Sequence, residues 1–378
     1  MKTILLVEDD PSIVRGLRDN LEREGYRVCS ETDGRKGYER AKREQPDLVI
    51  LDVMLPSMDG FQICSLLKRE GFGSPVFLLT GLTQERSRIE GLGKGADDYI
   101  GKPFNLQEFL LRVRNALRQR DSLIGRARLL EDEFLKARKI QMASLPRRHP
   151  RIPGLDVVGT TLPATEVGGD YFDYLKPGNG RLGVIVADVS GKGMPAAMYV
   201  QKMQGIIRSN EKKLREPSQT LRVLQEHLGD TMESSSFVTA VVAFFDTRAG
   251  TMSLAQAGHL PVLLRRKSAV RLLKPPGIWI GKTSAEKFEK SLVVETVRIL
   301  PGDTVVFYSD GLIEARDARG REFGLTRLKK CLGGSKSRKA NDAVSGCLTQ
   351  VRKFTGAASQ SDDITIVAVS IVAGHPHT

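Results

Sequence analysis

Residues 181–193, RLGVIVADVSGKG, decide how the second half of this 378-residue chain folds. Residues 182–187 form an unbroken apolar run, which is typical of a strand buried on both faces. The run ends on Asp188, and Ser-Gly-Lys-Gly then permits a tight turn before Pro195, a residue suited to the first turn of a helix. A carboxylate held there by rigid backbone can bind a hard cation, although a purely structural turn has the same pattern.

Three further segments place carboxylates where an apolar strand meets a glycine or polar turn: EVGGDYFDY, FYSDGLIEA and SDDITIVAV. The candidate acidic residues in these segments are Glu166, Asp170, Asp173, Asp310, Asp362 and Asp363. Because no Cys or His accompanies them, the ligand set favours magnesium or manganese over zinc. A carboxylate that bridges two such ions can generate a hydroxide for in-line attack on phosphorus.

The region around these segments is rich in strands. The predicted strands are 155–161, 182–187, 237–245, 252–256, 262–264, 305–308 and 364–370, and the predicted helices are 195–209, 217–232 and 341–354. Long consecutive strands around two central helices predict an α+β sandwich in which two sheets pack face to face.

The first 120 residues alternate short apolar strands with amphipathic helices. The predicted strands are 4–7, 48–51, 76–79 and 99–100, and the predicted helices are 13–24, 35–44, 60–69, 84–94 and 106–117. This alternation predicts an α/β doubly wound parallel sheet, with its chemistry at the carboxyl ends of the strands.

Polar residues stand at each of those strand ends: Glu8, Asp9, Asp52, Thr80 and Lys102. Clustered carboxylates with one lysine suit a divalent cation that neutralises an incoming phosphoryl group. Asp52 can then be the nucleophile that forms an acyl phosphate. Lys102 can bind the phosphate oxygens, and Thr80 can donate a hydrogen bond to them.

The motifs VEDD, LDVMLPSMDG, FLLTGL and ADDYIGKPF closely resemble those of two-component receiver domains, over the whole of residues 1–120. The resemblance implies a flavodoxin-like fold and a sensor histidine kinase or phosphotransfer protein as partner. It also implies these roles: Glu8, Asp9, Asp52 and the carbonyl of Met54 as Mg²⁺ ligands, Asp52 as phosphoacceptor, and Thr80, Tyr99 and Lys102 as switch residues. The alternative is a receiver that docks partners without accepting phosphate.

Residues 119–144 lack strand signals and predict a helix with an imperfect heptad pattern, in which Leu123 and Leu130 take d positions. A parallel homodimer, an intramolecular hairpin and an ordinary amphipathic helix all fit this pattern. Pro146 ends the helix.

The segments ARKIQMASLP, PATEVGGDYFDY, ADVSGKG, AQAGHLP, FYSDGLIEA and SDDITIVAV follow one another as in the metal-dependent PPM (type 2C) serine/threonine phosphatases, which they resemble. They are most similar to the branch of the stage II sporulation phosphatases. The resemblance implies a four-layer sandwich that holds two Mn²⁺ or Mg²⁺ ions.

Catalytic residues follow from the same resemblance. It makes Asp188 the ligand that bridges both ions, beside the carbonyl of Val189, and it makes Asp310 and Asp362 ligands of one ion. Asp170 would bind the second ion or its water. Asp363 is a possible ligand that more simply orients its neighbour, and Asp173 supports the site or occupies a turn. We expect His259 to be a structural loop residue and Trp279 to be a core residue.

These expectations combine into a response regulator whose receiver phosphorylation controls a phosphatase acting on a phosphorylated anti-sigma-factor antagonist or similar protein. The alternative is a catalytically silent scaffold that binds a partner when phosphorylated. The linker would transmit the signal to the helix at 195–209. The predicted boundaries are a receiver at 1–120, a helical linker at 121–150, a phosphatase at 151–372 and a polar tail at 373–378.

Composition limits the other possibilities. The net charge of +13 permits nucleic-acid binding or attraction of acidic phosphoproteins, but no helix-turn-helix, zinc finger or aromatic stacking motif favours nucleic acid. The sequence contains no run of eighteen apolar residues, so we expect no membrane span. The N-terminus does not have the pattern of a secretory signal. The four cysteines match no metal spacing, and we expect free thiols in a cytoplasmic protein.

Overall fold

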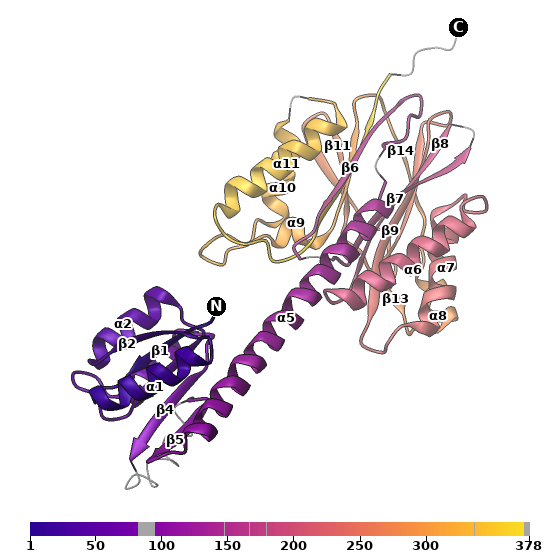
Figure 1. Cartoon of the computed structure of the whole chain (residues 1–378). Coiled ribbons are helices and arrows are strands. Elements are labelled where there is room, and N and C mark those ends of the chain that lie inside the picture. Colours follow the sequence, from indigo (N-terminus) through magenta and orange to yellow (C-terminus); the bar gives the residue numbers. More distant parts are fainter. Residues whose placement is uncertain (82–94, 147, 166, 179, 336, 374–378) are drawn as a thin grey trace. The chain divides into compact units, whose positions relative to one another are not determined.

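The computed structural model describes the whole chain except residues 82–94, 147, 166, 179, 336 and 374–378. The predicted helix at 84–94, Glu166 and most of the predicted tail therefore lie outside the described residues. The chain divides into two compact units, Met1–Glu131 and Asp132–Thr378 (Figure 1).

The N-terminal unit contains one five-stranded parallel sheet in the order β2-β1-β3-β4-β5. Its elements are β1 (Thr3–Val7), α1 (Pro11–Arg23), β2 (Arg27–Glu31), α2 (Gly34–Glu44), β3 (Leu48–Asp52), α3 (Gly60–Arg69), β4 (Val76–Gly81), β5 (Asp98–Lys102) and the first part of α5 (Leu106–Ser144). All five residues of β3 are buried, as a strand covered on both faces requires. The predicted doubly wound sheet is confirmed.

Strand β2 has no counterpart among the predicted strands. Its sequence, RVCSE, buries only Cys29, because the strand lies at the edge of the sheet beside β1. An edge strand has a neighbouring strand on one side only and is more exposed to solvent, so β2 carries polar residues and lacks the continuous apolar run that identified β1 and β3.

The C-terminal unit contains two sheets, in the orders β14-β10-β9-β8-β7, with β13 also pairing β9, and β12-β11-β15-β16-β6. The strands are β6 (Leu155–Leu162), β7 (Asp170–Gly178), β8 (Arg181–Val189), β9 (Phe237–Asp246), β10 (Thr251–Ala257), β11 (Val262–Arg266), β12 (Ala269–Leu273), β13 (Ile280–Gly281), β14 (Glu295–Arg298), β15 (Thr304–Tyr308) and β16 (Ile364–Ile371). The helices after α5 are α6 (Met194–Asn210), α7 (Pro217–Leu228), α8 (Ala285–Ser291), α9 (Asp310–Glu314), α10 (Gly324–Gly334) and α11 (Ala340–Thr355).

These elements form four layers, with α6 and α7 on one side of the sheets and α10 and α11 on the other (Figure 1). Three hydrophobic clusters fill the three spaces: one beneath α6 and α7, one between the sheets, and one beneath α10 and α11. The predicted four-layer sandwich is confirmed.

Seven helices and strands of the C-terminal unit have no counterpart among the predicted ones: β7, β12, β13, β14, α8, α9 and α10. Strand β7, DYFDYLKPG, buries two aspartates and therefore does not look like a core strand in the sequence.

The prediction for Trp279 was wrong. Trp279 is not a core residue: it is 53% exposed and packs its ring against Phe237. Successive side chains of a strand face opposite sides, and Ile280 takes the buried position next to it.

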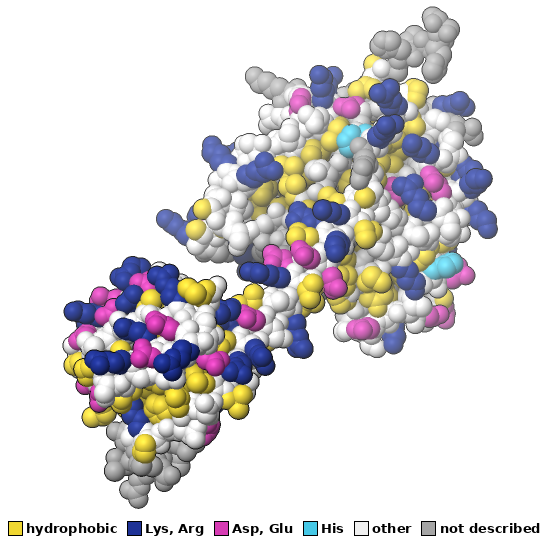
Figure 2. Space-filling view, viewed as in Figure 1, with side chains coloured by type: hydrophobic (Ala, Val, Ile, Leu, Met, Phe, Trp, Pro, Cys, Tyr) yellow, Lys and Arg dark blue, Asp and Glu magenta, His cyan; other side chains and the backbone are white. Residues whose placement is uncertain are grey.

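The linker is part of one continuous helix, α5, of 39 residues. Leu123 and Leu130 are 59% and 55% exposed on it. Among the helices that the structure describes, none combines the length and the apolar character needed to cross a membrane. On the face shown in Figure 2, Lys and Arg side chains are scattered among acidic and apolar ones rather than gathered in one stripe.

Two candidate acidic sites

The first acidic site lies at the carboxyl ends of β1 and β3. Glu8, Asp9 and Asp52 can each direct one carboxylate oxygen so that all three lie within 4.8 Å of one another. They meet because the carboxyl ends of parallel strands lie at the same edge of the sheet. Three carboxylates that converge in this way fit a hard divalent cation with oxygen ligands.

Lys102 lies in the same site, at the end of β5. Its Nζ is 2.6 Å from Oε2 of Glu8 and 3.1 Å from Oδ2 of Asp52. Burial raises the pKa of Glu8, and Lys102 opposes that rise. The ammonium group therefore compensates part of the negative charge where the carboxylates are least hydrated.

The predicted switch residues lie near this edge. Thr80 is the second-last residue of β4, and Tyr99 on β5 pairs with Leu78 of β4. Tyr99 packs against the core cluster that contains Val53 and Leu78, and burial raises its pKa. The side chain of Met54 is exposed directly after β3.

Gly60 is a residue of this site that the sequence did not single out. A Cβ atom at Gly60 would lie 2.2 Å from the carbonyl oxygen of Asp52. Glycine is therefore required where the start of α3 approaches the end of β3. The DG pair in LDVMLPSMDG was the available signal.

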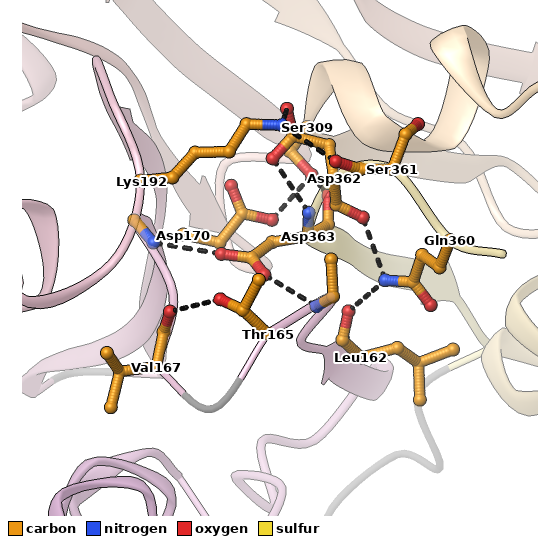
Figure 3. Close-up of polar contacts among 12 residues, drawn as sticks. Leu162, Thr165, Val167, Asp170, Lys192, Ser309, Gln360, Ser361, Asp362 and Asp363 are labelled. Carbon is orange, nitrogen blue, oxygen red and sulfur yellow. Dashed lines mark hydrogen bonds and ion pairs between the residues drawn. The ribbon is translucent and has the colours of Figure 1, made fainter. Parts of the chain in front are cut away.

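The second acidic site lies in the C-terminal unit and begins with two cross-strand aspartates. Asp170 is the first residue of β7 and pairs directly with Asp188 at the end of β8. Asp170 is buried and accepts a hydrogen bond of 2.6 Å from Oγ of Ser309. Figure 3 shows Ser309 beside Asp170. Ser309 also accepts a hydrogen bond from the backbone N–H of Thr365, so it joins β7 to the ends of β15 and β16.

Asp310 and Asp362 complete this site from the second sheet. Asp310 begins α9 directly after β15, and Asp362 precedes β16, which pairs with β15. Lys192, in the turn after β8, lies 2.9 Å from Oδ2 of Asp362 and donates a hydrogen bond to the carbonyl of Ser361 (Figure 3).

These aspartates influence one another strongly. Burial, followed by the charges of Asp310 and Asp362, raises the pKa of Asp188 to about 8. Burial and Asp188 raise the pKa of Asp170, and burial and Asp362 raise that of Asp310. Within the part of this unit that the structure describes, no three acidic groups bring ligand oxygens within 4.8 Å of one another. The site is therefore a set of mutually repelling carboxylates, and oxygen ligands of this kind suit hard cations.

Asp363 has a different environment from Asp362. Its carboxylate accepts hydrogen bonds from the backbone N–H groups of Ala164 and Gly169, at 2.8 and 2.9 Å (Figure 3). A Cβ at Gly168 would lie 2.0 Å from Oδ2 of Asp363. Asp363 thus holds the backbone that leads into Asp170.

Asp173 does not join the acidic site. It accepts hydrogen bonds from the hydroxyl of Tyr171 and from Arg208 on α6, at 2.9 and 2.8 Å. Asp170 and Asp173 are three positions apart on β7, so their side chains face opposite sides of the sheet. Asp173 ties β7 to α6.

His259 is buried behind the second site. Its Nδ1 lies 2.8 Å from Oγ1 of Thr239, the residue that pairs with Asp188 across β8 and β9. Burial lowers the pKa of His259 to about 4. Among the described residues, its Nε2 has no hydrogen-bond partner. The geometry agrees with a neutral loop histidine.

Gln141 was missed as a site residue. Its buried side chain donates to the carbonyl of Gly168 at 2.7 Å and accepts from the N–H of Gly168 at 3.0 Å. Ser144, one turn further along α5, accepts a hydrogen bond from Gln201 of α6. The predicted contact between the linker and α6 is confirmed. A polar residue at an apolar heptad position was the available signal.

Comparisons with known proteins agree with this division. A model described as "Response regulator receiver domain" matches residues 4–114, and one described as "Stage II sporulation protein E (SpoIIE)" matches residues 178–372. The chain is thus a receiver joined to a PP2C-type domain. Because the second match spans more than half of the chain, the chain belongs to the SpoIIE family. Both resemblances inferred from the sequence are confirmed.

Curated relatives match the receiver. The chain is 41% identical over 133 residues to "Alkaline phosphatase synthesis transcriptional regulatory protein PhoP" of Bacillus subtilis, covering 35% of this chain and 55% of that protein. It is 46% identical over 125 residues to "DNA-binding dual master transcriptional regulator RpaA" of Synechocystis, covering 32% and 52%. The chain thus spans about half the length of these relatives.

Solved structures match the C-terminal unit. The "SiaA-PP2C domain of Pseudomonas aeruginosa" has a TM-score of 0.57 at 21% identity, over 65% of this chain and 98% of that one, which shows the fold alone. The RsbU and RsbW domains of Rv1364c from Mycobacterium tuberculosis have a TM-score of 0.53 at 27% identity, over 60% and 62%.

Proposed function

We propose that this chain is a response regulator in which phosphorylation of Asp52 controls a metal-dependent protein serine/threonine phosphatase. The observation that carries the catalytic part is the meeting of Asp170, Asp188, Asp310 and Asp362 from four strand ends, with the pKa of Asp188 raised to about 8 by burial and by its acidic neighbours. Such a site is unfavourable without cations and becomes favourable with them.

In this proposal Asp188 would contribute to holding both ions, together with the carbonyl of Val189. Asp310 and Asp362 would help to hold one ion, and Asp170 would hold the other or its water. Bound Mn²⁺ or Mg²⁺ would supply a hydroxide nucleophile and stabilise the charge that develops on the phosphoryl group. Asp363 is buried and its carboxylate accepts two backbone hydrogen bonds that hold the loop before Asp170, whereas Asp362 is more exposed, and this favours Asp362 over Asp363 as the ligand.

Residue Asp170 is positioned rather than free to move. Ser309 donates to it, Asp363 holds the backbone before it, and Gln141 holds Gly168 two residues upstream. These three contacts therefore hold the carboxylate of Asp170 in place. Lys192 holds Asp362 and can approach the oxygens of a bound phosphate.

Regulation would follow α5. A phosphoryl group on Asp52, bound with Mg²⁺ at Glu8 and Asp9, would draw Thr80 and Tyr99 toward it, as implied for receivers. Since α5 is one helix from the receiver to Ser144, a shift of this helix would move Gln141 and with it Gly168. The proposal keeps the predicted division of the chain into a receiver at 1–120, a helical linker at 121–150 and a phosphatase at 151–372.

The partners follow from the same chemistry. A sensor histidine kinase or phosphotransfer protein would phosphorylate Asp52, and the substrate would be a phosphoserine or phosphothreonine protein such as an anti-sigma-factor antagonist. Leu123 and Leu130, exposed on α5, would pair with a second copy in a homodimer in the cytoplasm.

Hydrolysis of p-nitrophenyl phosphate by the full chain with Mn²⁺ or Mg²⁺ tests the catalytic part. We expect Asp188→Ala to lower kcat by about a thousandfold or more, whereas Asp230→Ala, which removes an exposed aspartate of the same unit, leaves it unchanged. A chain that binds phosphoproteins without hydrolysing them would instead be the silent scaffold.

A further inference from the structure

A pocket with a volume of about 380 Å³ opens beside the second acidic site. It lies between the end of α11, the segment that leads to Asp362 and the end of β6, and Arg138 of α5 contributes to it. Gly311 and Ser361, the chain neighbours of Asp310 and Asp362, form part of its wall. Gln360 donates to the carbonyls of Leu162 and Asp362 at 2.7 and 2.8 Å, so it joins the pocket to the site (Figure 3).

The lining of this pocket combines two chemistries. Leu162, Leu348 and Ile364 give it an apolar part, while Arg138, Arg316 and Arg352 bring three positive charges. All three arginines are exposed. Arg316 lies 3.0 Å from Glu322, but Arg138 and Arg352 form no ion pair with any residue that the structure describes.

The pocket borders the acidic site at Gly311 and Ser361. A cationic wall next to it offers a separate place for acidic side chains of the same substrate. Guanidinium groups bind carboxylates with charge-assisted hydrogen bonds, and such complementarity across an interface mainly determines which partner is accepted.

We propose that this pocket binds an acidic, partly apolar segment of the phosphoprotein substrate next to its phosphorylated Ser or Thr. The proposal rests on the proposed phosphatase function and adds the substrate class. The apolar part of the segment would contact Leu162 and Leu348, and its carboxylates would contact Arg138 and Arg352. These arginines are specificity residues, since they do not touch the aspartates proposed to hold the ions.

The test uses the full chain and two phosphoserine peptides, one with glutamate and the other with glutamine at the flanking positions. We expect kcat/KM to be about tenfold higher for the glutamate peptide. Arg352→Glu should abolish this preference and leave p-nitrophenyl phosphate hydrolysis unchanged. Lys353→Glu is the matched control: it makes the same charge change at the next position of α11, lines a different pocket, and should keep the preference.

Fluorescence anisotropy with labelled forms of both peptides measures binding without turnover, so it tests the pocket even if the chain proves to be no phosphatase. Failure of p-nitrophenyl phosphate hydrolysis would reject the proposed function, whereas equal binding of the two peptides would reject only the pocket. A preference for the glutamate peptide that survives Arg352→Glu would also overturn the proposal, and Arg138→Glu should weaken the preference in the same way.

Discussion

The two acidic sites of this chain solve the same electrostatic problem in different ways. In the N-terminal unit, Lys102 lies 2.6 Å from Glu8 and 3.1 Å from Asp52, and three carboxylates converge within 4.8 Å. Among the described residues of the C-terminal unit no three carboxylates come that close, and Lys192 pairs with the partly exposed Asp362.

The difference teaches that local charge compensation decides whether an acidic site is ready for its cation. A lysine inside the first site offsets part of the repulsion, so its carboxylates can lie close together. Among the described residues of the second site, no lysine or arginine forms an ion pair with Asp170 or Asp188, and burial raises the pKa of both carboxyls. We therefore expect the C-terminal unit to gain more from its cations than the N-terminal unit does.

The largest effect should appear in the metal dependence of stability. Mn²⁺ at a hundred times its Kd should stabilise the C-terminal unit by about 2.7 kcal/mol per site. Asp310→Asn should stabilise the metal-free unit, since it removes one repelling charge, and should weaken the response to Mn²⁺. Thermal unfolding followed with and without Mn²⁺ measures both effects, with Asp230→Asn as the control. A metal-free Asp310→Asn chain less stable than the original would contradict the repulsion described here.

The second-largest effect should be the influence of phosphorylation at the N-terminal acidic site on activity at the C-terminal acidic site. Treatment with a small-molecule phosphodonor such as acetyl phosphate should change phosphatase kcat/KM by about five- to a hundredfold, the usual range of allosteric coupling. Asp52→Asn should remove this response, because no acyl phosphate can form. Phosphatase assays before and after the donor is added provide the measurement. If Asp52→Asn responded like the original chain, the receiver would not control the phosphatase.

A smaller effect is expected where α5 meets the second site. Gln141→Ala leaves the N–H and C=O of Gly168 without partners, a loss of about 1–3 kcal/mol. We expect it to raise the Mn²⁺ concentration needed for half-maximal activity several-fold, because Gly168 leads into Asp170. Gln201→Ala, which removes a hydrogen bond to Ser144 on the same helix, serves as the comparison. Equal metal requirements in the two variants would show that Gln141 only fastens the helix.

The smallest expected effect is a pH dependence of stability that His259 gives to the C-terminal unit. His259 has a pKa of about 4 in the folded chain against an ordinary value of 6.5, so the unfolded chain binds the proton more readily between these values. Stability of the C-terminal unit should thus be lost as pH falls through this window, by about 1 kcal/mol at pH 5.5. His259→Gln should lack this contribution, and the difference between the two unfolding profiles isolates it from the carboxylates. The N-terminal unit contains no histidine and should show no such difference. Parallel profiles for the two chains would disprove the assignment.

Much of this protein could be predicted from local sequence. The buried strands β3 and β8 are continuous apolar runs, and the acidic residues stand at their ends, so the parallel sheet, the layered sandwich and the candidate aspartates could all be found. Edge and polar strands could not: β2 buries one residue, and β7 buries Asp170 and Asp173 with opposite orientations.

The sequence by itself determined which residue types stand at the strand ends, because a strand covered on both faces must be apolar along its length. Only the tertiary structure decided what each of those residues touches. Asp363 binds backbone while its neighbour Asp362 pairs with Lys192, and Gln141 reaches Gly168 from a helix far away in the chain. Such contacts depend on how elements distant in sequence pack together, and no local pattern encodes that packing.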